Sequence, residues 1–177
     1  MQTSTLPEPW LRNTHNELDS IRRGVLHAFD LCAEDTTLWC KSLRDDQLLE
    51  RPAGLAPIVF HLRHIPRSLD RLLTYAEGRQ LSSAQLDALN GELDTSGLHH
   101  RSIPDVFDEF RSGLRRAADR VRAISPDRFH EFVAIGKKQL PATVGGILVH
   151  CADHTQRHTG QIITTVQVLQ FTQPDRE

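Results

Sequence analysis

The sequence lacks most of the features that mark secreted, membrane-spanning or nucleic-acid-binding proteins. It has three cysteines, and Cys32 and Cys40, eight positions apart in a helical pattern, would lie about 12 Å apart, too far for a disulfide. An odd number of cysteines fits reduced thiols in a cytosol. No apolar run approaches the ~20 residues that span a bilayer. The 21 Lys and Arg are scattered among 23 Asp and Glu, with a net charge of −2, which argues against a basic nucleic-acid-binding surface.

The composition that remains is ordinary for a globular domain. The chain is 38% hydrophobic and 25% charged, as soluble proteins usually are, and 177 residues are enough for one well-buried core. We therefore expect a single domain over residues 1–177, with its core in 10–170 and a polar tail at 171–177. The first residues, MQTSTLP, lack the basic and apolar blocks of a signal peptide. We expect a cytoplasmic protein that binds neither nucleic acid nor membrane.

Apolar residues recur at helical spacing in four long segments, and no segment alternates convincingly as a strand does. The pattern predicts helices over about 16–43, 57–77, 105–124 and 144–169, the last capped by Thr143. Pro66, inside the second, removes a backbone donor, so we expect a kink or an irregular turn there. Shorter pieces are a helical turn at 45–50, a short helix at 84–89, an unclassified stretch at 129–133 and a loop at 136–138.

Four helical periods predict an all-α fold, a four-helix bundle. A long polar connection, residues 78–102, precedes the third helix and allows that helix to begin at either end of the bundle. His99 and His100 belong to this connection. Because neighbouring residues rarely converge on one ion, we expect both to be solvated.

The most informative stretch contains three histidines at steps of four, His150, His154 and His158. On a helix each such step turns the side chain by only about 40° and advances it by about 6 Å, so the imidazoles form a row. Two histidines at i and i+4 can hold one metal ion. His150 and His158 cannot both bind the same ion, because they are about 12 Å apart along the axis and a metal–nitrogen bond is about 2 Å.

The phase of the surrounding apolar residues selects one adjacent pair. On a wheel of about 100° per residue, His158 flanks the apolar wedge, His154 lies a little farther out, and His150 lies at the outer edge. The pair that faces the interior is therefore His154 and His158. Cys151 falls within the wedge and is interpreted as a small buried hydrophobe. Gly160 indicates a place where another backbone comes close.

A third ligand from another helix would distinguish a metal site from a surface helix with three solvated imidazoles. Metal sites in bundles use inward side chains of facing helices, and two histidines of the second helix compete for this role. His61 lies nearer the apolar stripe, whereas His64 shares its sector with Ser68, Arg71 and Tyr75, a polar wedge suited to the mouth of a site. Periodicity alone leaves the choice between His61 and His64 open.

The pairing of Leu62-Arg63-His64-Ile65 with the later run from His154 to Ile162 resembles the DinB/YfiT-like superfamily. The resemblance covers nearly the whole chain, from Trp10 to about Leu169. It implies a four-helix bundle with a long crossover connection, often homodimeric. In that family one histidine of the second helix and two of the last bind a divalent metal, which implies His64, His154 and His158 here.

The resemblance implies several activities rather than one. The family includes enzymes that transfer groups to low-molecular-weight thiols, a thiol-dependent isomerase, and the metal-binding domain of ergothioneine sulfoxide synthases, and many members have no established activity. Three imidazoles suit zinc, nickel or iron, and three ligands with an open position are the layout of a catalytic metal.

The residues around the histidine pair favour thiol chemistry over hydrolysis. Metal-assisted hydrolysis usually employs a nearby general base, but no acid lies between His154 and His158, and Asp153 points about 100° away from His154. We expect a metal-dependent enzyme acting on a small thiol or electrophile, S-transferase-like, with catalytic residues unassigned. The alternatives are a metal-dependent hydrolase and a non-catalytic homodimeric metal-binding bundle. Candidates for holding an anionic co-substrate are Arg63, Tyr75 and Arg157.

Overall fold

The protein is described from a computed structural model, in which residues 6–92 and 102–172 are described. Four long helices account for most of it: α1 (Ser20–Cys40), α3 (Ile58–Ala76), α5 (Ile103–Ala123) and α6 (Val144–Thr172). The shorter elements are α2 (Asp45–Leu49), α4 (Ser83–Asn90), the strands β1 (Phe132–Ile135) and β2 (Leu140–Thr143), and three single 3₁₀ turns (Pro9–Leu11, Pro52–Gly54, Pro126–Arg128). Among the described helices, none has a stretch long and apolar enough to cross a bilayer.

Side-chain caps fix where three of the long helices begin. Asp19 accepts hydrogen bonds from the backbone N–H groups of Ile21 and Arg22 at the start of α1. Ser102 accepts one from Asp105 at the start of α5, and Thr143 accepts one from Gly146 at the start of α6. Each cap satisfies backbone donors that have no partner inside the helix. The predicted role of Thr143 is confirmed.

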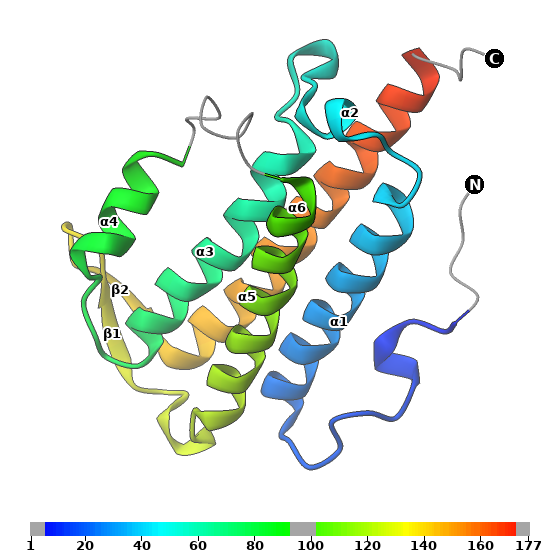
Figure 1. Ribbon diagram of the computed structural model, residues 1–177. Helices are drawn as coiled ribbons and strands as arrows, with labels where there is room; N and C mark the ends of the chain where they lie inside the picture. The colour runs from blue at the N-terminus through cyan, green and yellow to red at the C-terminus, as the bar shows by residue number, and fades with distance from the viewer. Residues whose placement is uncertain (1–5, 93–101, 173–177) are drawn as a thin grey trace.

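The four long helices run in two parallel pairs (Figure 1). Helix α6 packs against α1 and α3, and α5 packs against α3 and, less extensively, α1. On α3, Arg67 pairs with Glu109 and Glu77 with Arg120, so α3 and α5 run parallel. The chain therefore returns to the opposite end of the molecule between Ala76 and Ile103, by the long connection that carries α4. His99 and His100 fall in this connection but lie outside the described residues.

Helix α3 continues from Ile58 to Ala76 through Pro66, so of the two alternatives expected there, a kink or an irregular turn, the irregular turn is wrong and the kink stays a prediction. Pro66 packs on α5 at Gly113, where an added Cβ would lie 2.3 Å from the Cβ of Pro66. The proline ring thus fills a place that only glycine leaves open on the neighbouring helix. This contact sets a close approach between α3 and α5.

The hairpin of β1 and β2 was not predicted. Its strands pair antiparallel, from Phe132 opposite Thr143 to Ile135 opposite Leu140, and the loop between them uses Gly136 at φ +67°. Each strand is four residues long, and Phe132 is 82% exposed. So short and exposed a pair leaves almost no alternating apolar pattern in the sequence. The hairpin leads directly into α6.

The core lies between the long helices and is built from their apolar stripes. Its largest fully buried side chains include Leu26, Leu62, Leu69, Phe110, Leu148 and Ile162. The stripes that the sequence indicates on 57–77, 105–124 and 144–169 are the ones that face this core. Side chains next to the stripe of α3 and α6 therefore meet at the seam between these two helices.

Candidate metal centre

Helices α3 and α6 bring three histidines together at their seam. One nitrogen from each of His64, His154 and His158 lies within 4.8 Å of the others. His154 and His158 are one helical turn apart on α6, and His64 reaches them from α3, which runs in the opposite direction. The closest approach is between Nε2 of His64 and Nε2 of His154, at 2.9 Å.

The spacing of the three rings suits a shared cation. The ring centres of His64 and His158 are 4.4 Å apart, and those of His154 and His158 are 4.5 Å apart. With metal–nitrogen bonds of about 2.0–2.1 Å, imidazole nitrogens around one ion lie roughly 3–3.5 Å apart. The three histidines can therefore hold a divalent metal ion after small movements of their side chains.

Behind His64 lies a buried ion pair. Oε2 of Glu92 is 3.2 Å from Nδ1 of His64 and 3.0 Å from Nη2 of Arg71. Nδ1 of His64 is buried and has no other partner within the described residues, so Glu92 is the group placed to accept a hydrogen bond from it. Burial opposes ionisation of Glu92, but hydrogen bonds from His64 and Arg71 prevail and lower the pKa of this carboxyl. Glu92 is thus an ionised carboxylate beside the outer nitrogen of His64.

His61 lies next to the three histidines without belonging to the closest group. Its Nδ1 is 3.0 Å from Nδ1 of His158, and the residue is 3% exposed. One of these two nitrogens must carry the proton that the other accepts. If His158 donates, its Nε2 keeps a lone pair for a metal.

The buried rings favour their neutral forms. Burial, together with the charges of neighbouring histidines, lowers the pKa of His61 to about 4. The same causes lower the pKa of His154 and of His158 to about 4. These imidazoles are therefore neutral at pH 7, the state in which a ring nitrogen can bind a metal.

The family of the chain follows from comparison with family models. Residues 28–162, more than half of the chain, match the model described as the DinB superfamily. The chain belongs to the DinB superfamily. The resemblance drawn from the two histidine motifs is confirmed. The matched region contains His64, His154 and His158, which together are called the histidine cluster below. None of the curated proteins matches the chain.

Other side chains of this DinB-superfamily protein lie apart from the cluster. The side chain of His150 is 47% exposed and lies 3.6 Å from Asp153, which also pairs with Arg157 at 2.8 Å. Asp153 therefore faces solvent, as its phase predicts. Cys151 is fully buried, and burial raises the pKa of its thiol to about 12, in agreement with its interpretation as a small apolar residue.

A cavity of about 320 Å³ opens beside the cluster and has His61 in its wall. Its lining also includes Arg157, Gly160 and Gln161 from α6. The expectation that another backbone approaches Gly160 is wrong, because a Cβ added there would have no heavy atom within 4 Å. Of the three residues expected to hold a co-substrate, Arg157 lines this cavity, whereas Arg63 and Tyr75 do not.

Glu92 is the residue of the site that sequence reasoning missed. It follows Gly91 at the end of α4, in a polar stretch without periodicity, and nothing in that stretch distinguishes it from other acidic residues. The sequence feature that could have indicated this residue is Arg71 on α3, which lies on the same side of that helix as His64. A buried arginine beside a candidate ligand calls for a carboxylate, but only the fold shows which one supplies it.

Proposed function

We propose that this protein is a metal-dependent enzyme of the DinB superfamily that acts on a low-molecular-weight thiol or an electrophile. His64, His154 and His158 are the proposed ligands of a divalent ion, and the four long helices form the four-helix bundle that positions them. The convergence of three imidazole nitrogens within 4.8 Å, from two helices, carries the proposal. Zinc, nickel and iron all suit these ligands.

Two neighbours orient the proposed ligands. Glu92, held by Arg71, accepts a hydrogen bond from the Nδ1–H of His64 and thereby leaves the lone pair on Nε2 of that ring free. His61 has the same role for His158, because it accepts a hydrogen bond from the Nδ1–H of that ring. Groups that fix the tautomer of a ligating histidine in this way commonly strengthen metal binding.

The surroundings favour thiol transfer over hydrolysis. A divalent ion with an open position lowers the pKa of a bound thiol or water. Hydrolysis additionally employs a general base near the open position, and Glu92 does not meet this need because it is engaged by Arg71 and lies at the outer nitrogen of His64. The cavity beside His61 offers Arg157 and Gln161 to hold the remainder of a thiol co-substrate.

Metal content tests the ligand set. Untagged protein is supplied with Zn²⁺, Ni²⁺ or Fe²⁺, desalted and analysed, alongside His64→Ala, His154→Ala, His158→Ala and the control His150→Ala. We expect about one ion per chain in the wild type and in His150→Ala, and little in the other three. A wild type that retains no metal would remove the proposal. Retention by His64→Ala with loss by His61→Ala would assign the third position to His61.

Catalysis is tested separately, by thiol transfer to an epoxide and to a chloro-nitroaromatic compound. We expect activity that disappears on chelation and returns with metal. Activity that survives chelation would refute the mechanism. If metal binds but no transfer occurs, and chelation lowers the unfolding midpoint, the non-catalytic metal-binding bundle is the better description.

The expectations of a single domain over residues 1–177, a homodimer, cytoplasmic localisation and an absence of nucleic-acid and membrane partners stay predictions. Size-exclusion chromatography with light scattering tests the homodimer directly.

A further inference from the structure

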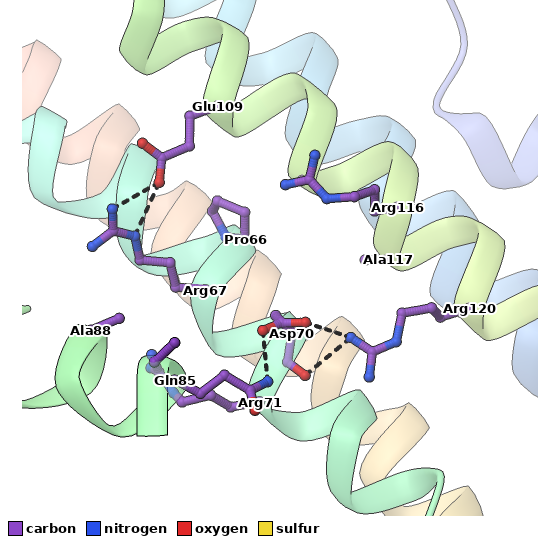
Figure 2. Close-up of a pocket in the computed structure, with 12 residues that line it drawn as sticks. Pro66, Arg67, Asp70, Arg71, Gln85, Ala88, Glu109, Arg116, Ala117 and Arg120 are labelled. Atoms are coloured by element: carbon purple, nitrogen blue, oxygen red, sulfur yellow. Dashed lines mark hydrogen bonds and ion pairs between the residues drawn. The ribbon is translucent and has the colours of Figure 1, made fainter. Parts of the chain in front are cut away.

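A second cavity of about 320 Å³ lies on the other side of α3, between α3, α4 and α5. Figure 2 shows the side chains around it. Its walls combine four arginines with small residues. The arginines are Arg67, Arg71, Arg116 and Arg120, and the small residues include Pro66, Ala84, Ala88, Gly113 and Ala117. Small side chains on three elements leave room for a ligand at this place.

Three of the four arginines already have carboxylate partners. Arg67 donates to Glu109 at 2.8 Å and 3.0 Å, and Arg71 pairs with Glu92. Arg120 lies 2.6 Å from Asp70 and 2.7 Å from Glu77. These pairs hold the three guanidinium groups in place and neutralise their charges.

Arg116 differs from the other three. It has no ion pair or hydrogen bond with any residue in 6–92 or 102–172, and its side chain extends from α5 toward α3 (Figure 2). As far as the described part of the chain shows, the cavity therefore has one guanidinium whose hydrogen-bond donors are unused. A planar guanidinium binds a carboxylate through two parallel hydrogen bonds, which adds geometric specificity to the charge attraction.

We propose that this cavity binds a small monocarboxylate, whose anionic group pairs with Arg116 and whose short apolar body lies against Pro66, Ala88 and Ala117. A single unpaired guanidinium matches a single negative charge. Asp70 and Glu109 line the same cavity and occupy Arg120 and Arg67, so these arginines do not offer a partner for the second charge of a phosphate dianion. The site is distinct from the histidine cluster, because Pro66 and Arg67 face α5 whereas His61 and His64 face α6.

NMR titration of the ¹⁵N-labelled protein tests the site, with acetate, butyrate, benzoate, butyramide and inorganic phosphate as probes. We expect saturable shifts at the amides of Ala84, Ala88, Gly113 and Ala117 for butyrate and benzoate. Acetate binds more weakly because it lacks the apolar body, and butyramide and phosphate give no saturable shifts. The same result is expected with and without Zn²⁺, since the cluster lies on the other face of α3.

Neighbouring arginines provide a matched control. Arg115 precedes Arg116 on α5 and is also exposed, but it does not line the cavity. Arg116→Gln is expected to weaken butyrate binding at least about tenfold, and Arg115→Gln to leave it within about twofold. Ala88→Phe, which fills the cavity without changing its charge, should also abolish binding. Equal weakening by both arginine variants, absence of saturable shifts, or binding of phosphate as strong as that of butyrate would overturn the proposal.

Discussion

Helix α3 presents two unlike faces to its two neighbours. Toward α6 it carries the imidazoles of His61 and His64, and toward α5 it carries charged side chains that meet oppositely charged partners. Arg67 pairs with Glu109 across the α3–α5 seam, whereas Nε2 of His64 meets Nε2 of His154 across the α3–α6 seam. Imidazole nitrogens with free lone pairs can bind a metal cation. Carboxylates that are already paired with arginines are less able to do so.

The two seams are joined by one ion pair. Arg71 belongs to the wall of the cavity on the α5 side, yet its partner Glu92 reaches Nδ1 of His64 on the α6 side. We therefore expect substitutions at the α3–α6 seam to change metal binding, and matched substitutions at the α3–α5 seam to change stability without changing metal binding.

The largest expected effect comes from the carboxylate behind His64. Glu92→Gln keeps the shape of the side chain but removes the negative charge that accepts the hydrogen bond from Nδ1 of His64, and we expect metal affinity to fall about 10–100-fold. Isothermal titration with Zn²⁺ measures this. Glu109→Gln, which breaks the comparable pair with Arg67 on the other seam, serves as the control and should leave metal affinity unchanged. Equal losses in the two variants would show that Glu92 acts only through general stability.

Packing at the α5 seam provides the next prediction. Gly113→Ala places a Cβ 2.3 Å from the Cβ of Pro66, and we expect the free energy of unfolding to fall by about 1–3 kcal/mol. Urea denaturation of the metal-free protein measures it. Combined with Pro66→Gly, Gly113→Ala should cost clearly less, measured against Pro66→Gly alone, because Pro66→Gly removes the Cβ that clashes. An equal cost in the two backgrounds would mean that Pro66 is not the obstacle.

Neutral histidines at the α6 seam make stability depend on pH. Because the folded-state pKa values of His61, His154 and His158 lie at about 4, the unfolded chain, with pKa values of about 6.5, binds protons first as pH falls. Their contribution is fully present above pH 6.5 and is lost on going down to about pH 4. We expect a loss on the order of 2 kcal/mol in metal-free protein, allowing for the partial exposure of two rings.

Denaturation curves at pH 7 and pH 5 measure this loss, with a double variant His154→Gln, His158→Gln as the comparison. The variant should show a clearly smaller difference between the two pH values. A wild-type protein that is more stable at pH 5 than at pH 7 would contradict the neutral state of the cluster.

The smallest effect is expected at Gly160. A Cβ added there meets no atom within 4 Å, so Gly160→Ala should stabilise α6 by up to about 1 kcal/mol through its higher helix propensity. Thermal denaturation measures the change, and the contrast with Gly113→Ala separates an open glycine from a packed one. Destabilisation by Gly160→Ala would show that the helix is crowded at this point.

The sequence predicted the structure best where apolar residues recur at helical spacing over several turns. The four long helices were predicted to within about four residues at either end, since apolar residues at helical spacing point to the side that must be buried. The phase of the apolar wedge on α6 distinguished the inward pair, His154 and His158, from the exposed His150. Strands of four residues with exposed side chains carry no such repeat, and β1 and β2 were missed for that reason.

Contacts between distant segments were less predictable. Periodicity left the choice between His61 and His64 open, and the structure separates them by what lies across the seam: Nε2 of His64 meets Nε2 of His154, whereas Nδ1 of His61 meets Nδ1 of His158. The approach of Glu92 depends on how α4 ends against α3, and the tolerance of Pro66 depends on a glycine more than forty residues later. Neither can be read from local pattern, because each is fixed by how two helices dock.

The most direct test is an anomalous-scattering map of crystals grown with Zn²⁺ and recorded on both sides of the zinc absorption edge. The account predicts one strong peak at the seam of α3 and α6, about 2 Å from nitrogens of His64, His154 and His158, with a fourth position open to solvent or ligand. A seam without a peak, with the three rings pointing apart, would contradict the account, and so would an ion enclosed by four protein ligands.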